Sequence, residues 1–217
     1  MNPALRTSAA HVFVDSVDAP ELDPDDAHHL FRVMRLREGE TVTVSDGRGA
    51  WRACTVGHSM LQPTGPPVQE LATQSITIAT AIPKGDRVDW MVQKLTEVGV
   101  GAIVFLHCTR SVVRWEGERG ERQLVKMRKV AREAAMQSRR VWLPRLSGPM
   151  PYAEAVALPG AVVAEPGATQ LTAAPVVIIG PEGGFTPDEL ALAPMLVGLS
   201  PHVLRVETAA LVAAVLS

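Results

Sequence analysis

A glycine-rich turn that follows an apolar run is the strongest candidate for a site that binds a small molecule. The apolar residues 176–179 lead into Gly180-Pro181-Glu182-Gly183-Gly184, and Thr186 followed by Pro187 is typical of a helix start. Glycine has no Cβ, so its backbone approaches a ligand closely. In open α/β sheets, ligands sit beyond the carboxyl ends of the strands, where this turn is expected. A tight turn without a ligand is the competing interpretation.

The turn does not match two familiar phosphate-binding patterns. No Lys-Ser or Lys-Thr pair follows the glycines, as a P-loop requires, and the GxGxxG order of a dinucleotide site is absent. An enzyme that holds a phosphate-bearing cofactor here would need a cation near Gly180–Gly184, and only Arg205 qualifies from the sequence.

Two more expected strands end in polar residues. The run 161–166 stops at Glu165-Pro166, and a strand expected over 202–206 contains Arg205, just before Glu207. Arg205 is the only Lys or Arg after residue 145. A lone cation at a strand end in an acidic region favours a site residue. A structural ion pair with Glu182 or Glu207 is nearly as well supported.

Basic residues are concentrated in one stretch of the chain. The formal net charge is −2, yet residues 110–145 carry eleven basic and four acidic side chains. A concentration of Lys and Arg on a near-neutral protein indicates an anionic partner such as RNA. A solvated helix face gives the same pattern and weighs about equally.

The first third of the chain reads mainly as β-structure. Asp23-Pro24 predicts a helix start, and Leu30, Val33 and Met34 are spaced to bury one face of that helix. Alternation over 41–56 around a glycine-containing turn predicts a β-hairpin. The Pro- and Gly-rich residues 61–70 show no periodicity and are interpreted as a linker that ends a small β-rich domain.

Strands and helices alternate over the remainder, which predicts an α/β domain with a mainly parallel sheet. Its strands are near-continuous apolar runs, as expected when both faces are covered. Strands are expected over 75–82, 102–108, 161–166, 175–179 and 202–206, and helices over 85–98, 118–140 and 152–158, from Thr186 and from Thr208. In the helix over 85–98 the apolar face comprises Val88, Met91, Val92, Leu95 and Val98.

The two cysteines and the apolar runs indicate the compartment. Cys54 and Cys108 are far apart, which predicts two small buried side chains, with no zinc site and no disulfide framework. No apolar run reaches membrane-spanning length, and the first residues lack the apolar stretch of a secretory signal. We expect a cytoplasmic protein without a membrane segment.

Five segments taken together resemble one enzyme family. They are HHLFRVMRLREGE at 28–40, KGDRVDWMVQKLTEVGV at 84–100, REAAMQSRR at 132–140, IGPEGGF at 179–185 and LRVETA at 204–209. In this order they resemble the RsmE family of 16S ribosomal RNA uracil-N3 methyltransferases, a branch of the SPOUT superfamily. In that family the last helix usually continues further than Ser217.

The resemblance implies a fold and partners that spacing alone does not. It implies a SPOUT α/β domain over 73–217 whose loops form a deep trefoil knot, an exception to the rule against threaded loops. It also implies a PUA-like β-barrel over 1–72 that grips RNA, and a homodimer with the active site near the interface. S-adenosyl-L-methionine would lie in the knot, against Ala164, Glu165, Pro166, Gly180, Pro181, Glu182, Gly183, Gly184, Leu199, Leu204, Arg205, Glu207, Thr208 and Ala209.

The chemistry of that reaction assigns further roles. N3 of uracil keeps its proton at neutral pH, and a sulfonium donor requires no metal, so the protein must align the reactants and remove one proton. Arg205 would stabilise charge on the uracil carbonyl oxygens, and Glu182 or Glu207 would orient Arg205 or accept the proton. The small-subunit 16S rRNA would contact Arg128, Lys129, Arg132, Arg139 and Arg140, together with Arg32, Arg35 and Arg37. Gln137 and Ser138 would reach the uracil edge, although helix capping or exposure explains these two equally well.

A protein of another class would use the same basic surface. A non-catalytic RNA-binding or ribosome-assembly protein would show no affinity for S-adenosylmethionine. The intact segments IGPEGGF and LRVETA argue against that alternative.

Overall fold

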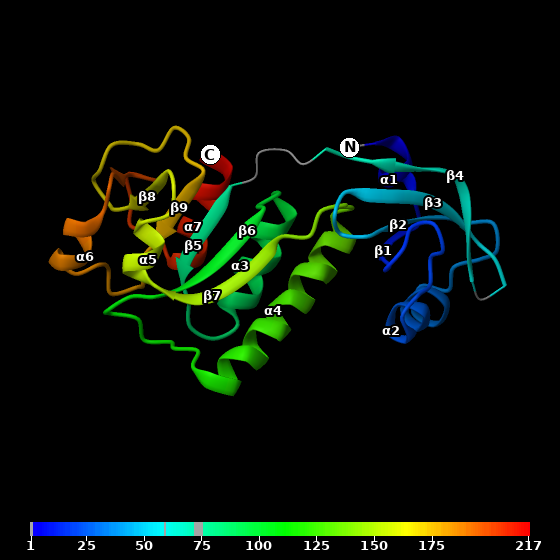
Figure 1. The fold of residues 1–217 in the computed structure, drawn as a ribbon, viewed down its shortest axis with the longest axis horizontal. Helices are drawn as coiled ribbons and strands as arrows, with labels where there is room; N and C mark the ends of the chain where they lie inside the picture. Colours follow the sequence, from blue (N-terminus) through cyan, green and yellow to red (C-terminus); the bar gives the residue numbers. More distant parts are fainter. Residues whose placement is uncertain (1, 59, 72–75) are drawn as a thin grey trace. The chain divides into compact units, whose positions relative to one another are not determined.

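The computed structural model describes residues 2–58, 60–71 and 76–217, which fall into two compact units (Figure 1). The first unit comprises Met1–Thr73 together with Arg132–Leu143, and the second comprises Gln74–Ala131 together with Pro144–Ser217. The predicted domain boundary between residues 72 and 73 lies outside the described residues. A division at one point of the chain would assign Arg132–Leu143 to the second domain, but this segment packs with the first unit.

The first unit is built on a four-stranded sheet in the order β1-β2-β3-β4. Strand β1 (Ala10–Phe13) runs parallel to β2 (Thr41–Ser45), whereas β2 with β3 (Ala50–Val56) and β3 with β4 (Leu61–Gln69) are antiparallel. The predicted hairpin over 41–56 is therefore confirmed. Helix α1 (Pro3–Thr7) precedes the sheet, and α2 (Pro24–His28) begins where expected, with Asp23 accepting from the Asp26 amide as N-cap.

Two predictions for this unit are wrong. The presumed linker over 61–70 is strand β4, which tolerates its prolines because it lies at the edge of the sheet and needs few backbone donors. The helical face of Leu30, Val33 and Met34 is not buried as a set. A π-helical turn, η1 (His29–Val33), widens the helix there, so Leu30 is 1% exposed while Val33 and Met34 are 59% and 42% exposed.

The second unit is a six-stranded sheet in the order β10-β8-β9-β5-β6-β7, and every pair in it is parallel, which confirms the predicted α/β class. Its strands are β5 (Thr77–Ala81), β6 (Ala102–His107), β7 (Arg145–Pro151), β8 (Ala161–Ala164), β9 (Val176–Ile179) and β10 (Leu196–Val197). Its helices are α3 (Arg87–Glu97), α4 (Gly117–Gln137), α5 (Tyr152–Val156), α6 (Pro187–Leu192) and α7 (Val206–Leu216), of which α4 continues into the first unit.

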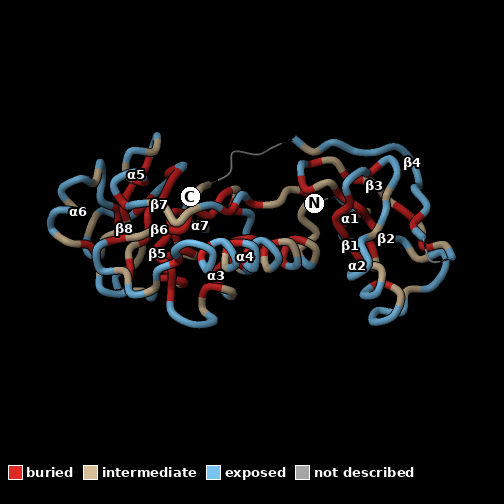
Figure 2. The backbone as a smooth tube through the Cα atoms, turned by 60° about the horizontal axis from the view of Figure 1, so that its bottom comes forward, coloured by how far each residue is buried: buried red, intermediate tan, exposed pale blue. Residues whose placement is uncertain are grey.

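Helices pack on both faces of this sheet, as the apolar strands predicted. The strands of the sheet carry much of the buried backbone, which is red in Figure 2. On one face Ile78 and Ile103 pack with residues of α3, α4 and α7, such as Met91. On the other face Ala79 and Val104 pack with α5 and α6. Successive residues of β5 and β6 therefore enter different cores.

Several predicted bounds differ from the structure. Residues 202–205 form no strand but a loop, and α7 begins at Val206 instead of Thr208. Strands β7 and β10 were not predicted. Helix α4 ends at Gln137 because Arg139 takes a positive φ of 60°, which stops the helix. Val98 follows α3 and is 46% exposed, so it does not belong to the buried face of that helix.

Candidate cofactor and active site

A cavity of about 320 Å³ lies at the carboxyl ends of β8 and β9. Three segments form it: the residues after β8, the glycine turn after β9, and the loop that leads into α7. Of the residues expected at the cofactor, the structure brings together Ala164, Glu165, Pro166, Gly180, Pro181, Glu182, Gly184, Leu199, Leu204, Arg205 and Ala209. Gly183, Glu207 and Thr208 are not among its lining residues.

Six further residues line the cavity and were not anticipated from the sequence. They are Ile179, Phe185, Ser200, His202, Val203 and Val206. Phe185 is buried and packs against Tyr152, with 5.0 Å between the ring centroids. His202, Val203 and Val206 lie in the segment 202–206, which was interpreted as a strand, whereas the structure has a loop over 202–205 that brings consecutive side chains to the cavity; Ser200 precedes that segment.

The glycines of the turn are required for different reasons. A Cβ at Gly180 would lie 2.8 Å from the ring of Phe185, a distance that real Cβ atoms do not show. Gly184 has a φ of +69°, which L side chains rarely adopt. A Cβ at Gly183 would instead meet Arg110 at 3.3 Å, so a side chain there would press on Arg110.

Hydrogen bonds of two side chains, Arg110 and Glu189, connect the segment after β6 with the glycine turn and the residues that follow it. Arg110 donates from Nη1 to the carbonyl oxygens of Gly183 and Phe185, at 3.0 and 3.2 Å. Glu189 accepts from the backbone amides of Thr109 and Thr186, at 2.7 and 2.8 Å. The segment after β6 is thereby bonded to the glycine turn and to the start of α6.

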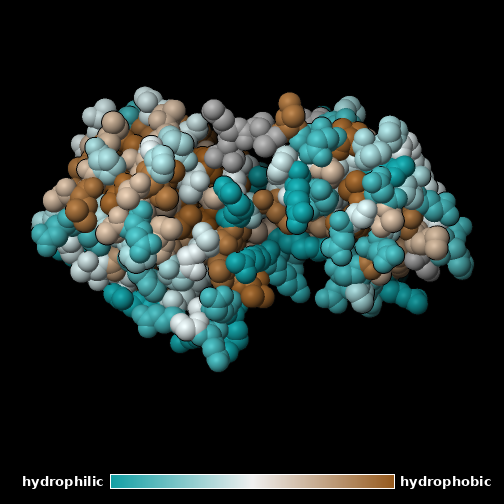
Figure 3. All heavy atoms as spheres, in the orientation of Figure 1, coloured by the Kyte–Doolittle hydropathy of each residue, from teal (hydrophilic) through white to brown (hydrophobic). Residues whose placement is uncertain are grey.

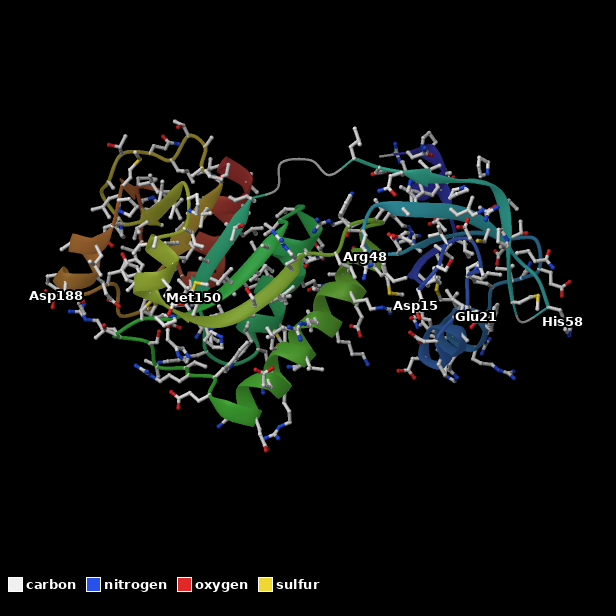
Figure 4. All side chains as sticks on the ribbon, in the orientation of Figure 1. Asp15, Glu21, Arg48, His58, Met150 and Asp188 are labelled. Carbon is white, nitrogen blue, oxygen red and sulfur yellow. The ribbon has the colours of Figure 1, made fainter. Side chains whose placement is uncertain are left out.

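Glu189 has a carboxyl whose hydrogen bonds favour its ionised form. Burial by itself raises the pKa of its carboxyl, but the hydrogen bonds from Thr109 and Thr186 outweigh burial, so the pKa is lowered. The same side chain completes a capping box with Thr186. Its neighbour Asp188 is exposed and lies at the outer edge of the second unit (Figure 4).

Arg205 is exposed at the N-cap of α7, not at the end of a strand as predicted. Among the described residues, its guanidinium makes no hydrogen bond or ion pair, so the structural ion pair with Glu182 or Glu207 is not formed. Since Arg205 lines the cavity, its charge is available to a ligand there.

Both of those carboxylates are paired with Arg87 instead. Its Nη2 lies 3.7 Å from Oε1 of Glu182, and its Nη1 lies 3.7 Å from Oε1 of Glu207. Arg110 and Arg87 therefore both lie beside the glycine turn, and the expectation that only Arg205 could supply a cation there was wrong. Both arginines precede the turn by 70 residues or more, so sequence spacing does not mark them as its neighbours.

The residues expected to contact RNA differ in their own bonding: two arginines are bonded within the first unit, and others are exposed. Arg132 pairs with Asp26 and Asp23 and donates to the Phe13 carbonyl at 3.2 Å, all within the first unit. The hydrogen bond with Asp26 is the main reason that the pKa of Arg132 is raised. Arg139 donates to the carbonyls of Ser8 and Ala9, at 2.9 and 3.3 Å.

Other members of that set face solvent. Arg128 and Lys129 are exposed on α4, as are Arg32, Arg35 and Arg37 in the first unit. Gln137 is also exposed, whereas Ser138 donates to the Ala134 carbonyl at 2.7 Å in the last turn of α4. Burial lowers the pKa of Arg140, which is partly enclosed. Hydrophilic atoms gather at the lower end of the second unit, where α4 begins (Figure 3).

Neither a metal site nor a membrane span was found in the parts of the chain that the structure describes. No three His, Cys, Asp or Glu residues there form a group that could hold a metal ion. None of the described helices is both long and apolar enough to cross a membrane. Cys54 and Cys108 are free and buried, and burial raises the pKa of their thiols to about 11 and about 12.

The second unit is a parallel α/β fold with a cavity at a glycine turn, and the first is a small β-rich unit. This combination is that of a protein that binds a small molecule in its α/β unit. The chain belongs to the RNA methyltransferase family. The family model of the RNA methyltransferase domain matches residues 69–217, and that of the RNA methyltransferase PUA domain matches residues 22–59.

Curated relatives and solved structures agree with this assignment. Ribosomal RNA small subunit methyltransferase E of Mycobacterium bovis is 33% identical, covering 88% of this chain and 83% of its own length. The enzyme of the same name from Bacillus subtilis is 27% identical over 87% of this chain and 85% of its own. The crystal structure of that enzyme from Neisseria gonorrhoeae, bound to S-adenosyl methionine, superposes with a TM-score of 0.77, at 26% identity and over 95% of each chain.

Proposed function

We propose that this protein transfers a methyl group from S-adenosylmethionine to N3 of a uridine in 16S small-subunit ribosomal RNA. The observation that carries the proposal is the cavity at the glycine turn, in a chain of the RNA methyltransferase family. The names of the relatives supply the RNA class, and the Neisseria gonorrhoeae structure supplies the cofactor. The position N3 rests on the resemblance of the five sequence segments.

The residues of the cavity suit this cofactor. A volume of about 320 Å³ falls in the usual range for small-molecule sites, about 300–1,000 Å³. Gly180 and Gly184 leave backbone exposed to a ligand, while Ile179 and Leu199 provide apolar walls. Glu165 and Glu182 bring negative charge to the wall, which favours a cationic ligand over a phosphate. Gly183, Glu207 and Thr208 do not line the cavity, so no direct contact with the cofactor is proposed for them.

When bound, the cofactor supplies an electrophilic methyl group on a sulfonium. The residues of this chain must then hold the uracil and manage one proton. Arg205 lies on the cavity wall with a free guanidinium, so it can stabilise negative charge on the uracil carbonyl oxygens. Glu182 is also on the wall, whereas Glu207 is 9% exposed behind it. We therefore assign proton acceptance or substrate orientation to Glu182.

RNA affinity is assigned to the exposed cations. Arg128, Lys129, Arg32, Arg35 and Arg37 are exposed and can reach phosphates, with Gln137 available to a base edge. Arg128 also donates from Nη2 to the Leu146 carbonyl at 3.4 Å. Arg132 and Arg139 are bonded inside the first unit and help to shape it, so their contribution to RNA binding would be indirect. Phosphate contacts of this kind give affinity and salt dependence, not base choice.

The finer features of the fold are part of the same proposal. They are the trefoil knot in a domain over 73–217, the closed PUA-like barrel over 1–72, and the homodimer. Exposed apolar side chains on the second unit, such as Trp90 at 41% and Val215 at 69%, support a subunit interface. A cytoplasmic location is proposed as well, and a ribosomal RNA substrate supports it.

The test combines binding with product analysis. Calorimetry should show one saturable site for S-adenosylmethionine on each chain. Incubation with small-subunit RNA from a strain that lacks the gene should add one methyl group, recovered as N3-methyluridine by mass spectrometry. A chain that binds the RNA but neither the cofactor nor its methyl group would instead be the non-catalytic alternative.

A further inference from the structure

The guanidinium of Arg87 contacts three separate segments of the second unit. Arg87, the first residue of α3, donates from Nε to the Lys84 carbonyl at 3.1 Å. Its two terminal nitrogens lie 3.7 Å from carboxylate oxygens of Glu182 and Glu207. The segment before α3, the glycine turn and the start of α7 therefore share one cation.

The two carboxylates stand in different environments. Glu182 is on the cavity wall, and its side chain is 30% exposed. Glu207 is 9% exposed, and its Oε2 is buried without a hydrogen-bond partner in the described structure. A buried carboxylate is costly unless a cation compensates it, and Arg87 is the cation in contact with it.

The pairing also explains why Arg205 is free. Arg205 lies two residues before Glu207 and lines the same cavity as Glu182, so it is a natural partner for both carboxylates. Because Arg87 already compensates them, Arg205 keeps its guanidinium for a ligand. A planar guanidinium can address two separate carboxylates while its Nε fixes its orientation, which an ammonium cannot do.

We propose that Arg87 is a positioning residue for methyl transfer: it holds Glu182 on the cavity wall and keeps Glu182 and Glu207 from binding Arg205. This proposal rests on the proposed function, since it concerns the same reaction. Arg87 itself is not among the residues that line the cavity, so it acts through the other three side chains.

The test uses Arg87→Gln, Arg87→Lys and a matched control in the full-length chain. Lys94→Gln is the control, because Lys94 lies on the same helix, is 32% exposed against 35% for Arg87, and forms an ion pair with Glu97 where Arg87 forms two. Each variant is assayed for its melting temperature, its affinity for S-adenosylmethionine, and its single-turnover rate at saturating RNA and cofactor.

We expect Arg87→Gln to bind the cofactor within about threefold of wild type but to transfer the methyl group about 100-fold more slowly, the order lost with one charge-stabilising donor. Arg87→Lys should recover about tenfold of that loss, because the charge remains while the paired geometry is lost. Lys94→Gln should match wild type. A near-normal rate in Arg87→Gln, or full activity in Arg87→Lys, would overturn the proposal.

A second substitution separates positioning from simple charge compensation. Adding Glu207→Gln to Arg87→Gln removes the uncompensated buried carboxylate, so it should restore the melting temperature while the rate stays low. If the rate returns as well, Arg87 serves only to neutralise Glu207 and is not a positioning residue. If the wild-type chain itself methylates no small-subunit RNA, it is the proposed function that fails, and this outcome is seen before any variant is compared.

Discussion

Arg205→Ala is the substitution that separates chemistry from structure most cleanly. The side chain is exposed, and among the described residues its guanidinium has no hydrogen bond or ion pair. Its removal should therefore change the free energy of unfolding by less than about 0.5 kcal/mol, as for other surface changes away from special features. The carbonyl of Arg205 still accepts the first helical bond, from Ala209 at 2.8 Å, so α7 keeps its start.

The expected loss lies in the rate of methyl transfer. If Arg205 stabilises charge on a uracil carbonyl oxygen, its removal should slow single-turnover methylation roughly 10²–10³-fold, or about 2.7–4 kcal/mol of activation free energy. Affinity for S-adenosylmethionine should change little, since a cofactor that carries a sulfonium gains nothing from an adjacent cation. Arg205→Lys should restore only part of the rate.

Arg110→Ala provides the contrasting variant. It removes two hydrogen bonds to the glycine turn, so cofactor affinity and the melting temperature should fall together. The decisive comparison is the single-turnover rate at saturating RNA and cofactor beside a thermal melt of each variant. A stable Arg205→Ala protein that binds the cofactor and methylates at a near-normal rate would refute the assigned role.

Three other predictions concern Gly180, the basic residues of α4 and His11. Gly180→Ala should lower the free energy of unfolding by about 1–3 kcal/mol and weaken cofactor binding, because the new Cβ meets the buried Phe185 ring at 2.8 Å. An unchanged cofactor affinity in calorimetry would show that the ring moves aside without cost. Arg132→Ala should lower the melting temperature through its lost bonds to Asp26 and Phe13. Arg128→Ala with Lys129→Ala loses one long hydrogen bond, from Arg128 to the Leu146 carbonyl at 3.4 Å, so it should change stability little and flatten the salt dependence of RNA binding by about two contacts; the opposite pattern would exchange their roles. Burial lowers the pKa of His11 to about 4, so the unfolded chain gains a proton first as the pH falls below the usual value of 6.5, and stability present at pH 7 is lost as the pH approaches 4. Urea unfolding should show a loss of about 2 kcal/mol from this group between pH 7 and pH 5, and a His11→Gln variant that keeps the full slope would exclude it.

The sequence by itself determined the features that depend on neighbouring residues. The glycine turn, the Thr186 cap, the hairpin over 41–56 and the parallel α/β class follow from local patterns of apolar, small and capping residues. Such patterns are readable because the contacts that stabilise them lie within a few positions along the chain. The resemblance of five segments then indicated the family, which the family models confirm.

Tertiary structure alone decided what the local patterns left open. The prolines of β4 are compatible with a strand because β4 has an edge position, and residues 202–205 form a loop that lines the cavity although their apolar run predicted a strand. Arg87 meets Glu182 and Glu207, and Arg132 meets Asp26, although nothing in the spacing of these residues marks them as partners. A charge has no periodicity and pairs with whichever opposite charge the fold brings near. Arg205 is left free for a ligand because the folded chain gives its two expected partners to another arginine.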